Sequence, residues 1–272
     1  MNHPLRFPVL ALALLAGASA GAQAPAAPPK QAAFLTIYRE TIKTGHDAAH
    51  AKVEAGWPAA FEKAKSPGYY LALASLTGIS EVWFSEVWES YAAVGKYRDA
   101  LAANAAHTAE IDRLALADAA HVDGVRVIEA IGRPDLGHGS PDVTGHRFWE
   151  VTTMRIRPGT ESQFADAAKA YKALATRAMP HASWRIWQVS AGMVGPTFLI
   201  FSSVVSNADI DVGFAEGMAA DSKMTAEERA ILDKFSRESL ISAETQRFRL
   251  DPQMSYVPAE TKALDPKFWM KK

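Results

Sequence analysis

Two histidines and a glutamate at helical spacing are the first residues that could carry chemistry. His46, His50 and Glu54 follow one another at intervals of four residues. Residues four apart lie on one face of a helix, where two imidazoles and a carboxylate could contribute ligands to a transition metal. The segment is not the H-E-x-x-H motif, because Asp47 takes the place of the catalytic glutamate. The simpler interpretation is a solvated helix face beside an apolar stripe.

Charged residues inside predicted strands form the second group. Glu150 and Arg185 each lie between apolar or aromatic neighbours in segments rich in β-formers. Burying a charge is costly unless the charge is paired, so these residues predict a mutual ion pair or the polar part of a ligand-binding lumen. Exposure to solvent is the alternative. In an enzyme, a buried Glu150 could serve as a general base.

Aromatic side chains could line such a lumen. Six of the seven tryptophans lie in the predicted folded regions: Trp57, Trp83, Trp88, Trp149, Trp184 and Trp187. Alternate residues of a strand face opposite sides of its sheet. Our candidates for contact with a planar ligand are Tyr38, Trp83, Arg185 and Trp187. The alternative is that the aromatic residues only fill the core.

The composition excludes several classes of function. The chain of 272 residues has no cysteine, which excludes thiol nucleophiles, thiolate metal sites and disulfides. Its formal net charge is −1, with mixed charges and no basic stripe, so we expect no nucleic-acid partner. The sequence contains no glycine-rich phosphate loop and no G-x-S-x-G nucleophile elbow. It identifies no cofactor.

The first residues have the layout of a Sec-type signal peptide. Arg6 precedes a short apolar core over 9–16, and small residues follow. Cleavage after Ala20, Ala22 or Ala24 fits this pattern, and we favour Ala24. The apolar core is too short for a membrane span, and no later segment is long enough. The sequence therefore predicts a periplasmic or secreted protein with no membrane span after cleavage.

The remaining chain is predicted to contain one unit twice. Segments 34–45 and 148–159 match at an offset of 114 residues, and later 108–110 recurs as 225–227 at an offset of 117. Each copy follows the order strand, helix, strand, strand, helix, strand. The expected strands are 34–41, 69–76, 79–87, 125–131, 148–156, 183–189, 197–205 and 244–250.

The helices are expected to begin at turn residues. Capping boxes are predicted for Thr44 with Asp47, Thr160 with Gln163, and Thr225 with Glu228. Pro58 is expected to kink the first helix. The chain then divides into a signal peptide (1–24), an extended segment (25–32), a first repeat (33–137), a linker (138–146), a second repeat (147–250) and a C-terminal tail (251–272).

The element order predicts the fold class. A β-α-β-β-α-β unit is the ferredoxin-like split motif, whose sheet carries helices on one face only. Two such units can bury their bare faces against each other, so we expect an α+β protein whose ferredoxin-like repeats pack as an intrachain pseudo-dimeric α/β barrel. In element order and duplication, residues 33–250 resemble the dimeric α/β-barrel superfamily, which includes the antibiotic-biosynthesis monooxygenases and the NIPSNAP-like proteins. The resemblance implies a lumen that often holds a small apolar or aromatic ligand, sometimes haem, and sometimes no cofactor.

Three functions remain open at this stage. The first is an exported protein that binds a small apolar or aromatic molecule between the two sheets. The second is a cofactor-independent monooxygenase or isomerase that acts in the same lumen, with Glu150 as its base. The third is a haem- or metal-binding protein that uses His46, His50 and Glu54. A homodimer is compatible with each.

Overall fold

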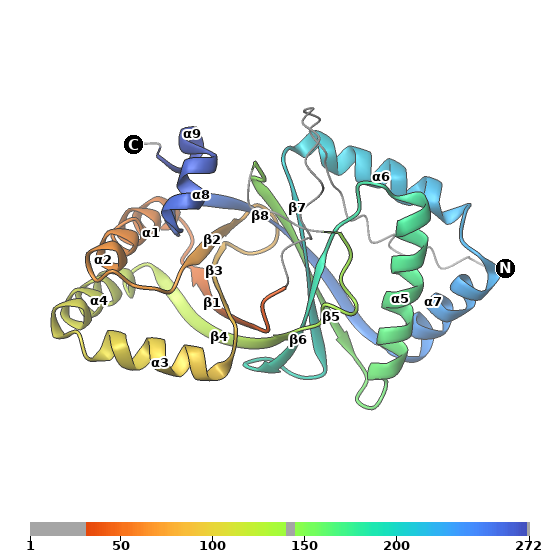
Figure 1. Ribbon diagram of the computed structural model, residues 1–272, viewed down its shortest axis with the longest axis horizontal. Coiled ribbons are helices and arrows are strands. Elements are labelled where there is room, and N and C mark those ends of the chain that lie inside the picture. Colours follow the sequence, from red (N-terminus) through yellow and green to blue (C-terminus); the bar gives the residue numbers. More distant parts are fainter. Residues whose placement is uncertain (1–30, 140–144, 271–272) are drawn as a thin grey trace.

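A closed antiparallel barrel of eight strands forms the centre of the molecule (Figure 1). The computed structural model describes residues 31–139 and 145–270, so the predicted signal peptide lies outside the described residues. Around the barrel the strands follow the order β1-β3-β2-β8-β5-β7-β6-β4, and β4 pairs with β1 to close it. Their bounds are β1 (Phe34–Ile42), β2 (Tyr70–Ser75), β3 (Glu81–Trp88), β4 (Val122–Gly132), β5 (Phe148–Ile156), β6 (Arg185–Ala191), β7 (Thr197–Val204) and β8 (Leu240–Tyr256).

Helices cover the barrel on two opposite flanks (Figure 1). One flank carries α1 (Asp47–Glu54), α2 (Trp57–Lys63), α3 (Tyr91–Ala102) and α4 (Ala105–Asp118). The other carries α5 (Glu161–Ala178), α6 (Asn207–Asp221) and α7 (Ala226–Glu238), and α8 (Ala259–Leu264) and α9 (Pro266–Trp269) end the described chain. The prediction of an α+β fold with a closed barrel is confirmed. Within the described residues, no helix combines the length and apolar character that a membrane crossing needs.

The strands expected over 69–76, 79–87, 183–189 and 197–205 form two hairpins. β2 pairs with β3 and β6 pairs with β7, each antiparallel. β8 is longer than the expected strand 244–250 and spans 17 residues. Its first part pairs with β5 and its last part with β2, so this one strand joins the two halves of the barrel.

The helix starts agree only in part with the prediction. Thr225 and Glu228 form the predicted capping box of α7. The other two capping boxes are wrong: α1 begins after His46 rather than Thr44, and the hydroxyl of Thr160 donates to the carbonyl of Arg157. The expected kink is a break between α1 and α2, and the proline lies in the first turn of α2. There its missing N–H leaves no helical hydrogen bond unmade.

Buried apolar side chains form three separate clusters. The barrel core fills the interior with residues of all eight strands and of the C-terminal helix: Leu35, Ile37, Leu73, Trp83, Ile128, Ala130, Trp149, Val151, Trp187, Leu199, Phe201, Phe248, Leu250, Val257, Phe268 and Trp269. The first helix layer lies under α1–α4 and includes Ile42, Phe61, Tyr70, Phe84 and Tyr97. The second helix layer lies under α5–α7 and includes Met154, Phe164, Leu174, Phe198 and Phe235. The strands are thus buried on both faces.

Candidate functional site

Two of the candidate lumen residues belong to the barrel core. Trp83 is fully buried, and its indole Nε1 donates to Oε2 of Glu81 at 3.0 Å. Glu81 also accepts from Arg39, whose Nη2 lies 2.7 Å from Oε1. Trp187 is buried in the same core. Both tryptophans therefore pack inside a barrel that side chains already fill.

Glu150 and Arg185 do not meet. Glu150 alternates along β5 with residues of the barrel core, so its side chain faces the helix side of the sheet. There Nε of Arg247 donates to Oε1 of Glu150 at 2.7 Å. Arg185 pairs in register with Phe201 of the barrel core, and its Nη1 donates to the carbonyl of Gly139 at 2.9 Å. The partner of Glu150 is on β8, and no local pattern predicts that register.

Tyr38 also lies outside the barrel interior. It pairs in register with Phe84, and both side chains belong to the first helix layer. Burial raises the pKa of the Tyr38 hydroxyl, and the nearby Glu86 carboxylate raises it further. The five residues proposed for one lumen are therefore divided between two faces of the sheet.

The first helix layer contains an acid–histidine cluster made of Glu40, His50, Glu54 and Asp118. One ligand atom from each of the four side chains lies within 4.8 Å of all the others. β1 supplies Glu40, α1 supplies His50 and Glu54 one turn apart, and the end of α4 supplies Asp118. The helical spacing predicted from the sequence thus brings two of the four residues together, whereas the other two come from distant elements.

The four side chains are held close by burial and by one imidazole. His50 is 1% exposed, Glu54 is 4% exposed and Asp118 is 5% exposed. His50 Nε2 lies 2.9 Å from Oε2 of Glu40 and 3.6 Å from Oδ1 of Asp118. Oδ1 of Asp118 is buried and has no hydrogen-bond partner among the described residues. Glu40 and Asp118 therefore share a single imidazole, and the buried carboxyl group of Glu54 lies beside them.

This crowding changes the proton affinity of the acids. Burial raises the pKa of the Glu54 carboxyl to about 9, and the carboxylates of Glu40 and Asp118 add to the rise. Burial and Glu40 also raise the pKa of Asp118, whereas His50 lowers it. A low-dielectric site with several acids favours their neutral forms unless a positive charge is present.

His46 does not belong to this cluster. Its Nδ1 lies 3.0 Å from Nδ1 of His121, and the two rings are half-buried. His46 precedes the first residue of α1, so its side chain is not held on the helix face that His50 and Glu54 share. Glu40 and Asp118 were not predicted from the sequence, because strand and helix patterns do not show which elements pack together.

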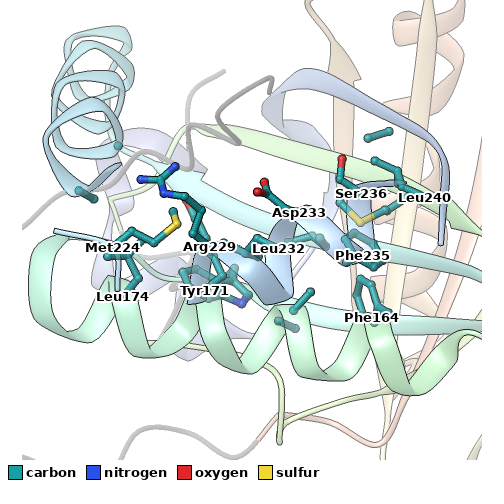
Figure 2. A pocket seen from close by; sticks show the side chains of 18 of the residues that line it. Phe164, Tyr171, Leu174, Met224, Arg229, Leu232, Asp233, Phe235, Ser236 and Leu240 are labelled. Atoms are coloured by element: carbon teal, nitrogen blue, oxygen red, sulfur yellow. The ribbon is translucent and has the colours of Figure 1, made fainter. Parts of the chain in front are cut away.

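The second helix layer contains a partly open apolar cavity of about 220 Å³, which we call the second-layer pocket (Figure 2). Its walls come from α5, α6, α7 and the outer faces of the second four strands. Aromatic, aliphatic and methionine side chains form most of the lining, including Met154, Phe164, Tyr171, Leu174, Met179, Trp184, Ile186, Ile200, Met224, Leu232, Phe235 and Leu240. The sequence did not predict this cavity, because an apolar stripe along a helix does not reveal an unfilled volume.

Polar groups lie along one edge of the pocket. Figure 2 shows Arg229, Asp233 and Ser236 on the side away from α5, with Tyr171 and Phe164 near α5. Nη1 of Arg229 lies 3.2 Å from Oδ1 of Asp221, which also lines the cavity. An apolar chamber with a charged edge suits a small ring-shaped molecule that carries one polar substituent.

The second-layer pocket does not fit haem. Among the described residues that line it there is no histidine. A cavity of about 150 Å³ accommodates one benzene ring, so a porphyrin macrocycle is too large for this volume.

Sequence comparison gives no match to a family model and none to a curated protein. Solved structures do match. An anthrone oxidase-like protein aligns with a TM-score of 0.56 and 10% identity over 82% of this chain and 93% of its own. A candidate monooxygenase from Fusobacterium nucleatum aligns with a TM-score of 0.54 and 10% identity over 81% and 93%. Another, from Lactobacillus acidophilus NCFM, aligns with a TM-score of 0.53 and 9% identity over 84% and 97%.

These similar structures belong to the dimeric α+β-barrel superfamily with its ferredoxin-like units. At identities of 9% and 10%, the similarity establishes a shared fold. It extends over most of each chain.

Proposed function

We propose that this protein binds a small aromatic molecule in the second-layer pocket. The observation that carries the proposal is the apolar cavity of about 220 Å³ between α5, α7 and the sheet. The ligand class is the one expected from the sequence, but the place differs from the expected lumen. The barrel interior is filled by its own side chains, whereas the second helix layer leaves a cavity open.

The volume and the lining define the ligand further. Because benzene occupies a cavity of about 150 Å³, a volume of about 220 Å³ suits one or two fused rings. The rings of Phe164, Tyr171 and Phe235 offer faces and edges for stacking. Arg229 at the edge favours a ligand with a hydroxyl or carboxylate group.

Titration with 1-naphthol tests this proposal by calorimetry. Ala168 lines the pocket, so Ala168→Phe places a ring in the cavity and should weaken binding at least about tenfold. The matched control is Ala173→Phe, because Ala173 is exposed on the same helix. Equal affinity in wild type and Ala168→Phe would reject the pocket as the binding site.

A second candidate is a cofactor-independent oxygenase that acts on the molecule bound there. Its support is the fold shared with candidate monooxygenases and an anthrone oxidase-like protein. In such a reaction a substrate methylene and O₂ give a carbonyl and water, and the substrate supplies all four electrons. A general base would remove the first proton from the methylene carbon.

Two residues are candidates for the general base of this oxygenase, and they differ in their distance from the pocket. Glu150 and Met154 face the same side of β5 but lie four residues apart, about 13 Å along the strand. Asp233 instead lines the pocket directly. Oxygen uptake with an aromatic substrate that is lost in Asp233→Asn and kept in Glu150→Gln places the reaction in the pocket. Oxygen uptake that is lost in Glu150→Gln and kept in Asp233→Asn instead supports Glu150, the base predicted from the sequence.

We further infer that the chain is a duplicated ferredoxin-like unit that packs as an intrachain pseudo-dimer. The first four strands lie side by side in the order β4-β1-β3-β2, and the last four lie in the order β8-β5-β7-β6. Each strand of the second order is the first-half strand number plus four, so the two halves have the same strand order. The ends of β4 and β8 cross to β6 and β2, which is the reciprocal contact expected of a two-fold arrangement. Gly45 and Gly159, 114 residues apart, both adopt the left-handed backbone that opens the helix after the first strand of each half.

Export remains part of the proposal. Its support is the layout of the first 24 residues, and the test is the N-terminal sequence of protein recovered from the periplasm or medium. Protein that keeps its first residues and stays in the cytoplasm would reject export. The similar folds are compatible with a homodimer. Light scattering on the same preparation measures the molar mass and so tests for it.

A further inference from the structure

We propose that the acid–histidine cluster is a binding site for one divalent transition-metal ion, with Glu40, His50, Glu54 and Asp118 as its protein ligands. The site lies in the first helix layer, on the opposite flank of the barrel from the second-layer pocket (Figure 1). The proposal does not depend on ligand binding in that pocket.

The geometry of the four ligand atoms supports a single ion. Ligands lie about 2.0–2.2 Å from such a metal, so atoms on opposite sides of it are about 4.0–4.4 Å apart. The four atoms already lie within 4.8 Å of one another, before any ion draws them inward. His50 Nε2 faces two of the carboxylates, so its lone pair would reach the same centre.

An unpartnered atom is the second, independent observation. Asp118 is 95% buried, and its Oδ1 faces His50 across 3.6 Å without any hydrogen bond among the described residues. A buried carboxylate oxygen without a hydrogen bond is costly, because burial has removed its hydrogen bonds to water. A cation between Asp118, His50 and the two glutamates would satisfy it.

The negative charge of the cluster also favours a bound cation. Three carboxylates surround one imidazole, and among the described residues no lysine or arginine lies within ion-pair distance of them. A divalent ion bound to the ionised acids would reduce a charge of −3 to −1. Side-chain burial would then strengthen the attraction rather than oppose it.

The ligand types select the class of metal. Imidazole nitrogen suits Zn²⁺ and Fe²⁺, and carboxylate oxygen suits Mn²⁺, whereas Ca²⁺ and Mg²⁺ prefer sites made of oxygen alone. One nitrogen and three carboxylates therefore favour Zn²⁺, Fe²⁺ or Mn²⁺. Entry would occur beside Glu40, whose side chain at 14% exposure is the most accessible of the four.

The full chain, treated with EDTA and dialysed, tests the proposal by calorimetric titration with Zn²⁺ and with Mn²⁺, and with Ca²⁺ for contrast. Asp118→Asn and His50→Gln each remove one ligand and should weaken binding at least about tenfold. Glu86→Gln is the matched control, because it neutralises a buried carboxylate on the same flank outside the cluster. Bound metal should also raise the unfolding temperature of wild type and control but not of the two cluster variants.

One equivalent of Zn²⁺ or Mn²⁺ in wild type and Glu86→Gln, with weakened binding in both cluster variants, supports the site. Circular dichroism in metal-free buffer checks their folding, and if one unfolds, Glu40→Gln at the edge of the cluster replaces it. No binding in wild type, or unchanged affinity in the cluster variants, overturns the proposal. Loss of binding on His46→Gln alone also overturns it, because the metal would then lie at the His46–His121 pair.

Discussion

The two helix layers cover the same barrel but differ in chemistry. The first layer contains buried acids, histidines and tyrosines, including the acid–histidine cluster. The second contains stacked aromatic rings, such as Phe164 on Phe198 at 3.7 Å between centroids, and a partly open apolar cavity. The comparison teaches that the side chains on each flank of the barrel, and not the barrel itself, decide what that flank can bind.

The two sites lie at corresponding places in the chain. Glu40 and Met154, His50 and Phe164, and Glu54 and Ala168 are each 114 residues apart, and Asp118 and Phe235 are 117 apart. All four residues of the second set line the second-layer pocket. These are the offsets found from the repeated sequence pattern. If the halves arose by duplication, these four positions thus became polar in the first half and apolar in the second.

The largest expected effect is loss of a ring from the second layer. Phe164 is 3% exposed and stacks on Phe198, so Phe164→Ala should lower the free energy of unfolding by about 3–5 kcal/mol. Urea denaturation measures the change. Lys169→Ala, exposed on the same helix, should stay within about 0.5 kcal/mol of wild type. A loss under about 1 kcal/mol in Phe164→Ala would show that the second layer is not held by its rings.

A pH-dependent effect near neutral pH is expected in the first layer. Burial raises the pKa of the Glu86 carboxyl from 4.5 to about 7. Because the folded pKa lies above the unfolded value, the folded state holds the proton more tightly, and stability should fall as pH rises from about 5 to about 8. At about 1.4 kcal/mol per pKa unit, this loss is at most about 3 kcal/mol.

Glu86→Gln isolates that contribution. The difference in free energy of unfolding between variant and wild type should grow with pH over this range, as urea titrations at pH 5, 6.5 and 8 would show. The register places the uncharged Ser202 at the matching position in the second half. Parallel pH profiles for wild type and variant would contradict the assignment.

The smallest expected effect distinguishes two helix starts that look alike in sequence. Thr225 accepts a hydrogen bond from the backbone of Glu228, so Thr225→Ala should cost about 1 kcal/mol. Thr44 precedes the first-layer helix but makes no cap, so Thr44→Ala should cost less than about 0.5 kcal/mol. Equal losses in the two variants, measured by thermal unfolding, would show that the caps do not differ.

Much of the fold was predictable because it depends on local patterns. The expected strands over 34–41 and 148–156 correspond to β1 and β5, and the segments 69–76, 79–87, 183–189 and 197–205 contain the strands of both hairpins. Capping was predicted less well. Thr160 had the spacing of a capping box, yet its hydroxyl donates to a preceding carbonyl. A short polar side chain has several backbone partners within reach, and the sequence does not rank them.

The site was less predictable than the fold. His50 and Glu54 were found from helical spacing, but Glu40 and Asp118 join them from a strand and a distant helix. Glu150 and Arg185 were expected in one lumen, and the structure gives Glu150 a different partner, Arg247. In a closed barrel with two helix flanks, strands are apolar on both faces, so alternation cannot tell which face a charged residue occupies.

By itself, the sequence determined the order of strands and helices, the offset between the halves and the helical pairing of His50 with Glu54, because each depends on neighbours in the chain. Only the tertiary structure decided that the barrel interior is filled, that a cavity remains beside α5, and that Glu40 and Asp118 meet the histidine. Those outcomes depend on side-chain volumes and strand register between segments far apart in the chain, which no local pattern records.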